Sequence, residues 1–249
     1  MKSKLGMAAM VLVAVGAFAT SAHAQCGTGP IIEFDTNTWS YESNYDIPNF
    51  NSVVGSNLTV VGKITQMCNP PFTVNVADPT KEYTLVMLNM ISQGTVHTVV
   101  FGTGMKHETM YTGGDFIIYE DTSPDAPTLA TLAPNPPNAQ VPARFLDGTI
   151  ILTGTLSGMD VIVTRGPTGT YTHSFRADYL FTGPAGGSQY VPVSGNGPGL
   201  LHGTWCHNGS APGLCTLPAG YTAQPNGKFD NPVTSAQKST WGTLKQLYR

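Results

Sequence analysis

The stretch of residues 149–182, TIILTGTLSGMDVIVTRGPTGTYTHSFRADYLFT, decides the fold. From Tyr171 to Thr182, aromatic and small residues fall on one face and mostly polar residues on the other. Alternation with a period of two is typical of a half-buried β-strand. Ser157-Gly158 and residues 165–169 (RGPTG) are turn formers. The stretch therefore predicts three consecutive antiparallel strands, at 149–156, 159–164 and 171–182.

Further strand patterns lie on both sides of this stretch. They cover residues 58–65, 83–91, 96–101, 116–121, 189–193 and 200–205. The run YTLVMLNMI at 83–91 is apolar on both faces, which predicts a strand that is covered on both sides. SQGT at 92–95 predicts a hairpin turn, and the region up to residue 55 predicts an extended, irregular lead-in. The sequence predicts an all-β fold, an antiparallel β-sandwich or barrel.

The composition agrees with this fold class. Charged residues make up 11% of the chain, against about 25% in ordinary soluble domains. The chain has 28 glycines and 19 prolines, which excludes helical bundles and coiled coils. An apolar content of 41% excludes charge-driven disorder.

A proline-rich segment at 121–143 raises the question of domain number. Proline cannot donate to a sheet ladder, so this segment is a long surface loop or a linker between two domains. We favour a long loop within a single β-rich domain at 25–232. The tail, 233–249, predicts a short amphipathic helix. This C-terminal helix would serve as a docking or sorting element, or dock on its own domain, through one apolar face: Trp241, Leu244, Leu247 and Tyr248.

Residues 1–24 have the features of a secretory signal peptide. Lys2 and Lys4 precede an apolar run, and Ala22-His23-Ala24 forms an A-x-A cleavage signal before Gln25. The rest of the chain has no apolar stretch of transmembrane length. We therefore expect a secreted, periplasmic or cell-surface protein without a transmembrane segment in its mature form.

Net charge limits the possible partners. Removing residues 1–24 takes the formal net charge from −3 to −5. An acidic chain of this kind has no electrostatic reason to bind nucleic acid. Three cations, Lys238, Lys245 and Arg249, lie in the tail, where there is no acid.

Four cysteines remain after cleavage: Cys26, Cys68, Cys206 and Cys215. An even number in an exported protein indicates two disulfides. The spacing favours Cys206–Cys215 and Cys26–Cys68. A metal site that combines Cys206 and Cys215 with His202 and His207 is the alternative, but the sequence lacks a C-x-x-C motif.

Motifs of common catalytic sites are absent from the sequence. It contains no G-x-S-x-G, no Walker loop and no G-x-G-x-x-G in a βαβ setting, and no cofactor is predicted. His107 and Glu108 are expected in a glycine-flanked loop after Phe101, and as sequence neighbours they would point apart if the chain is extended. His173 is interpreted as a hydrogen-bonded core histidine. Carboxylates at the start of the proline-rich loop could hold Ca²⁺: Glu120, Asp121 and Asp125.

Aromatic residues are the better lead to a binding role. Trp39 and Tyr41 lie in a polar N-terminal segment, and Trp205 and Tyr221 border the Cys206–Cys215 region. Exposed aromatic platforms on β-folds stack on sugars or on partner surfaces. Core or edge packing is the alternative interpretation of these four residues.

Three stretches carry a resemblance: GGDFIIYEDTSPDA at 113–126, RFLDGTIILTGTL at 144–156 and STWGTLKQLYR at 239–249. They are similar to uncharacterised exported bacterial β-proteins, and the resemblance assigns no functional residue. The leading hypothesis is an exported non-enzymatic β-protein that serves as a cell-surface, matrix or binding module, with a glycan or another surface protein as its partner. A secreted polysaccharide hydrolase with carboxylates on its sheet is the alternative, and a calcium- or metal-binding periplasmic protein is a further one.

Overall fold

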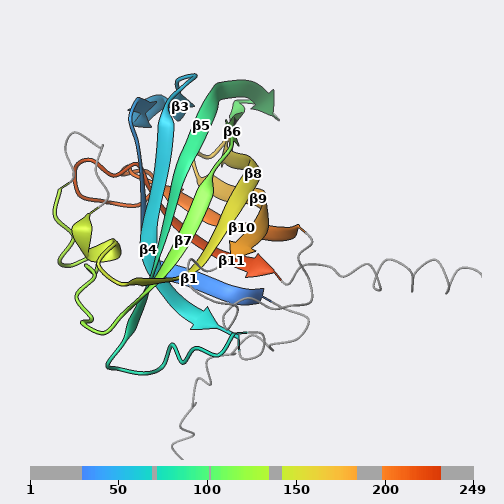
Figure 1. Ribbon diagram of the computed structural model, residues 1–249. Coiled ribbons are helices and arrows are strands. Elements are labelled where there is room, and N and C mark those ends of the chain that lie inside the picture. The colour runs from blue at the N-terminus through green and yellow to red at the C-terminus, as the bar shows by residue number, and fades with distance from the viewer. Residues whose placement is uncertain (1–29, 69–71, 101, 135–141, 184–197, 231–249) are drawn as a thin grey trace, which may run out of the picture.

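The computed structural model describes residues 30–68, 72–100, 102–134, 142–183 and 198–230. Within them the regular secondary structure is almost entirely β-strand (Figure 1). The elements are β1 (Pro30–Glu42), β2 (Tyr45–Asp46), the 3₁₀ turn η1 (Ile47–Asn49), β3 (Asn51–Ser52), β4 (Asn57–Met67), β5 (Glu82–Val100), β6 (Gly104–Thr112), β7 (Asp115–Asp121), η2 (Ala143–Phe145), β8 (Thr149–Arg165), β9 (Tyr171–Gly183), β10 (Gly199–His207) and β11 (Ala223–Asp230). The predicted strand 189–193 and the predicted C-terminal helix lie outside the described residues.

The sheet closes into an antiparallel barrel. Neighbours follow chain order from β1 through β4, β5, β6, β8, β9 and β10 to β11, and β11 pairs again with β1. β7 is an additional strand that continues the line of β6, so that both lie between β5 and β8. The break between them falls at Gly113 and Gly114, which both have positive φ angles. The fold is therefore a barrel rather than a sandwich.

Two predicted turns are bulges inside long strands. β5 runs without a turn through residues 92–95, where its register with β6 shifts and Gly94 has a φ of 88°. β8 likewise continues through Ser157-Gly158, where its register with β9 shifts. Glycine-containing pairs suit a bulge as well as a hairpin, because both need a residue with positive φ. The meander therefore has fewer, longer strands than the sequence predicts.

Three further long strands were not predicted. His107 and Glu108 lie in β6 rather than in the predicted loop, because this segment pairs with β5 on one side and β8 on the other. The lead-in region contains the 13-residue strand β1. β11 includes Pro225, which argues against a central strand. The ladder between β1 and β11 is interrupted between the pairs Phe34–Gly227 and Ser40–Ala223. Pro225 lies in this gap, so its missing N–H breaks no hydrogen bond to β1.

Apolar side chains form two clusters, one on each face of the sheet. Inside the barrel, β9 contributes the predicted alternating face, including Phe175, Ala177, Tyr179 and Phe181. The outer cluster contains Val86 of β5, and it is covered by η2 and the segment around Ala126 and Leu132. β5 is thus covered on both sides, as the run YTLVMLNMI predicts.

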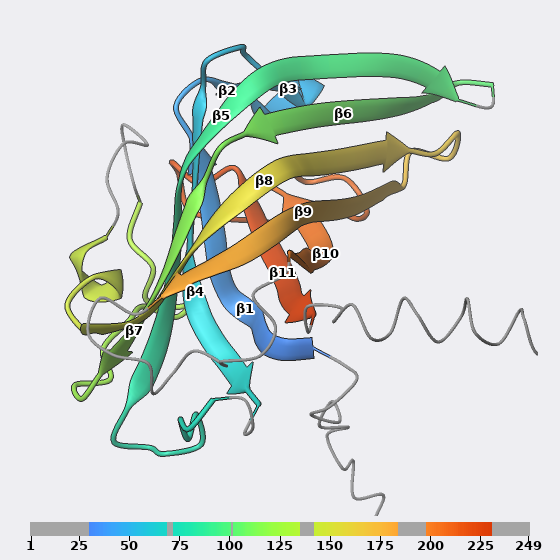
Figure 2. The same ribbon diagram turned by 45° about the vertical axis from the view of Figure 1, so that its right-hand side comes forward.

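Long strands carry one part of the sheet past the rest of the barrel. Figure 2 shows the ends of β5, β6, β8 and β9 extending beyond β10 and β11, with β2 and β3 beside them. Within the described residues no helix is long and apolar enough to cross a membrane.

Candidate functional site

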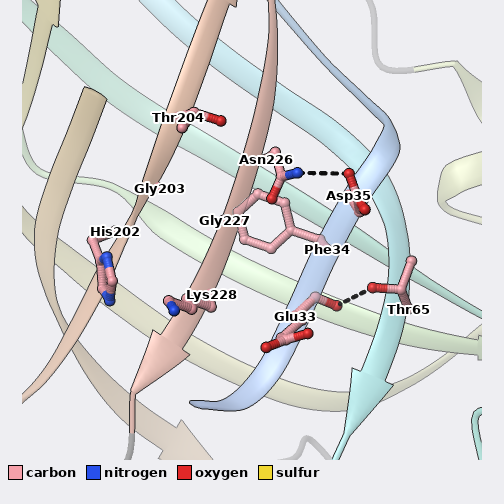
Figure 3. A pocket seen from close by; sticks show the side chains of 10 residues that line it. All are labelled: Glu33, Phe34, Asp35, Thr65, His202, Gly203, Thr204, Asn226, Gly227 and Lys228. Atoms are coloured by element: carbon pink, nitrogen blue, oxygen red, sulfur yellow. Dashed lines mark hydrogen bonds between the residues drawn. The ribbon is translucent and has the colours of Figure 1, made fainter. Parts of the chain in front are cut away.

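A polar groove of about 300 Å³ lies on the outer face of four neighbouring strands, β10, β11, β1 and β4 (Figure 3). Its polar side chains occupy outward positions that alternate with buried ones, and they are Glu33, Asp35, Thr65, His202, Thr204, Asn226 and Lys228. These residues belong to the two ends of the chain. Closure of the barrel brings them together, because it places β11 between β10 and β1.

Glycine explains why the surface is hollow at this point. Gly203 and Gly227 face each other across β10 and β11, at inward positions. A Cβ on Gly227 would lie 2.5 Å from the ring of Phe175 and 2.7 Å from the ring of Phe34. A Cβ on Gly203 would lie 2.0 Å from the carbonyl oxygen of Asn226. The missing side chains let both strands sit close to the core rings, and we infer that this hollows the outer face.

Cross-strand register arranges the groove in rows. Lys228 lies opposite His202 on β10 and opposite Glu33 on β1. In the next outward row, the amide of Asn226 donates to the carboxylate of Asp35 over 2.6 Å. The groove therefore offers acidic, basic, amide and hydroxyl groups side by side.

A histidine–carboxylate pair borders the groove. Nε2 of His202 lies 2.9 Å from Oδ2 of Asp230, and both side chains are about one-third exposed. His202 therefore does not belong to a metal site with the two cysteines. Cys206 and Cys215 are instead bonded to each other, with 5.7 Å between their Cα atoms, as predicted. A disulfide favours a non-reducing setting.

A second group of polar side chains is buried inside one end of the barrel. The carboxylate of Glu42, at the end of β1, accepts a hydrogen bond from Ser52 and another from the hydroxyl of Tyr111 over 3.0 Å. Ser52 also contacts the hydroxyl of Ser92 at 2.5 Å. Burial raises the pKa of Glu42 to about 7, although these hydrogen bonds act in the opposite direction.

Imidazole and aromatic rings pack against one another at the same end of the barrel. Phe50 packs between His107 and His207, with ring centroids 5.3 and 5.4 Å away. Burial lowers the pKa of His173 to about 4 and that of His207 well below its usual range. Nε2 of His173 and Nδ1 of His207 are buried without a hydrogen-bond partner among the described residues. His173 is thus partly buried, but this nitrogen lacks the predicted hydrogen bond.

The four aromatic residues of the predicted binding platform are buried. Their exposed fractions are 0% for Trp39, 3% for Tyr41, 2% for Trp205 and 1% for Tyr221. Trp39 and Tyr41 face outward on β1, but η2 and the segment near Tyr221 cover them. Trp205 faces inward and packs against Phe175. The exposure that a surface platform needs is therefore absent, and packing explains these residues.

The predicted cation ligands are only partly brought together. Asp121 and Asp125 have carboxylate oxygens within 4.8 Å of each other and of Glu82. Glu120 lies apart and pairs with Lys81 at 2.7 Å. Glu82 is already engaged by Lys63 at 2.7 Å and by the N–H groups of residues 125 and 126. This carboxylate therefore anchors the start of the proline-rich segment.

Other predicted residues lie outside the described part of the chain. These are Cys26 and the apolar face of the tail. Cys68 is not a free thiol. Sequence reasoning did not single out Glu42 or the groove residues Glu33, Lys228 and Asn226. The outward positions of Glu33, Asn226 and Lys228 and the inward position of Glu42 become readable only once β1 and β11 are assigned.

The chain is therefore a closed antiparallel β-barrel with a polar groove on its outer face. No protein-family model, curated protein or solved structure matches the chain.

Proposed function

We propose that the protein is an exported, non-enzymatic module that binds a hydroxyl-rich ligand, a glycan segment, in the groove on β10, β11, β1 and β4. The observation that carries the proposal is the concentration of hydrogen-bonding side chains of several kinds around a hollow in an otherwise regular sheet. Ligand sites are concave and hold a few convergent polar groups. The groove volume of about 300 Å³ is at the small end of the usual range.

The groove carries charged groups of both signs beside neutral donors and acceptors. Two carboxylates, Glu33 and Asp35, face one ammonium group, Lys228, and the imidazole of His202 is paired with Asp230. An anionic ligand would meet the carboxylates, and a cationic ligand would meet Lys228. Alternating donors and acceptors suit sugar hydroxyl groups, which both donate and accept hydrogen bonds. Export is supported by the signal-peptide pattern of residues 1–24 and by the disulfide.

The experiment is a screen of the exported protein against a glycan array, followed by calorimetry on each ligand found. We expect Lys228→Ala and Asn226→Ala to weaken binding about 10-fold or more, since each removes a hydrogen bond to the ligand. The matched control is Lys106→Ala. Lys106 pairs with Glu108 on the outer face of β6, four strands around the ring from β11.

Two results would overturn the proposal. One is the absence of any glycan ligand, or binding that both groove variants leave unchanged. The other is hydrolysis of a bound oligosaccharide, which would favour the polysaccharide hydrolase instead.

A further inference from the structure

Two histidines face each other on the part of the sheet that extends past the barrel. His97 of β5 and His107 of β6 are direct cross-strand partners. Their Nδ1 atoms are 2.8 Å apart, at hydrogen-bond distance, so without a metal one ring donates a proton to the other, and a metal ion bound to both atoms would displace that proton. His97 is exposed and His107 is half-buried, so solvent and solutes reach the pair. Neither residue lines the groove.

The distance between the two nitrogens fits one type of metal geometry. With metal–nitrogen bonds of about 2.0 Å, two ligands at a right angle lie about 2.8 Å apart, whereas two ligands at the tetrahedral angle lie about 3.3 Å apart. Square-planar and tetragonal sites with nitrogen ligands are typical of Cu²⁺ and Ni²⁺. Cu²⁺ is bound most tightly among the divalent first-row metals.

Neighbouring groups hold both rings in place. Nε2 of His97 lies 3.4 Å from Oδ1 of Asn51. A proton on Nε2 directed at this oxygen leaves Nδ1 of His97 free of a proton, as a metal ligand requires. The ring of His107 packs on Phe50 at 5.3 Å. The strands themselves are fixed by the pairs Val96–Glu108 and Thr98–Lys106 on either side.

We propose that His97 and His107 form a chelating site for Cu²⁺, in which the two Nδ1 atoms occupy adjacent positions of a tetragonal complex and water fills the others. This site is independent of the glycan-binding groove. It also differs from the predicted acidic and cysteine–histidine sites, because its ligands come from one hairpin.

The test is a calorimetric titration of the purified, untagged protein with Cu²⁺, in a buffer that contains a weak competing chelator. Electron paramagnetic resonance of the one-to-one complex should show coupling to two imidazole nitrogens. We expect His97→Gln and His107→Gln each to weaken binding at least about 10-fold and to remove the two-nitrogen signal.

The matched control is His202→Gln, at another partly exposed histidine on the barrel. It should keep both the wild-type affinity and the wild-type spectrum. Circular dichroism establishes that each variant is folded. Unchanged Cu²⁺ affinity in the His97→Gln/His107→Gln double variant, or a spectrum without imidazole coupling, would show that copper binds elsewhere and would overturn the proposal.

Discussion

Glu42 is a residue whose ionisation opposes folding. Its side chain is 1% exposed and is surrounded by hydroxyl groups inside the barrel. A pKa of about 7 in the folded state, against 4.5 as the ordinary value, means that the folded protein binds the proton more tightly. Stability from this group is therefore complete below about pH 4.5 and is lost as the pH rises through 7. The pKa difference corresponds to about 3 kcal/mol.

Replacement by glutamine removes this loss. Glutamine cannot ionise, and its carbonyl oxygen can still accept a hydrogen bond from Ser52 or Tyr111. We expect the free energy of unfolding of Glu42→Gln, relative to wild type, to increase by about 3 kcal/mol between pH 4 and pH 8. Urea unfolding at the two pH values measures this difference.

The variant must be compared with wild type at each pH, because protonation of histidines lowers the stability of both proteins as the pH falls. His173, with a pKa lowered to about 4, contributes stability that is present above about pH 6.5 and is lost as the pH falls through 4. This contribution is common to both proteins and cancels in the difference. Glu108→Gln, at a surface ion pair with Lys106, is the control and should keep the wild-type pH profile. A pH-independent difference for Glu42→Gln would contradict the prediction.

At the scale of elements, the turn η2 secures the segment that covers the outer face of the sheet. Phe145 is fully buried and packs on Trp39 with ring centroids 6.0 Å apart. Its carbonyl oxygen accepts a hydrogen bond from Thr84 over 3.0 Å. The contact ties the end of the proline-rich region to β1 and β5.

Truncation of Phe145 should lower the stability of the folded protein. We expect Phe145→Ala to lower the free energy of unfolding by about 3–5 kcal/mol, because it removes a buried ring and leaves a cavity against Trp39. Leu146→Ala is the control, since Leu146 is 38% exposed and its truncation should cost about 1 kcal/mol or less. Denaturant unfolding compares the two. Equal, small effects would show that η2 contributes little to the fold.

The strand boundaries show which information local sequence patterns do not contain. The alternation of Tyr171–Thr182 predicts β9 and its inward face correctly, because period-two burial is a local property. Ser157-Gly158 has the residues of a turn, yet it forms a bulge. Whether a glycine reverses the chain or only bends it depends on the partner strands, and these lie elsewhere in the sequence.

At the scale of the whole molecule, export and oxidation should be visible in the mass of the protein. We expect the exported chain to begin at Gln25, having lost residues 1–24, because the A-x-A signal precedes that residue. Intact-mass measurement of protein from the envelope or medium tests this. Non-reducing peptide mapping should find Cys206 linked to Cys215. An exported species that retains Met1 would contradict the cleavage prediction.

The sequence by itself determined the fold class, the inward face of β9 and the bond between Cys206 and Cys215. Each of these depends on composition or on residues close together in the chain. Only the tertiary structure decided that the sheet closes, and closure requires β1 to pair with β11. The groove and the Glu42 network follow from that closure, since Glu33 meets Lys228 and Glu42 meets Tyr111 across long separations in sequence. Long-range pairing is a property of the whole chain, because each strand face can pack equally well against several partners until all the strands are placed.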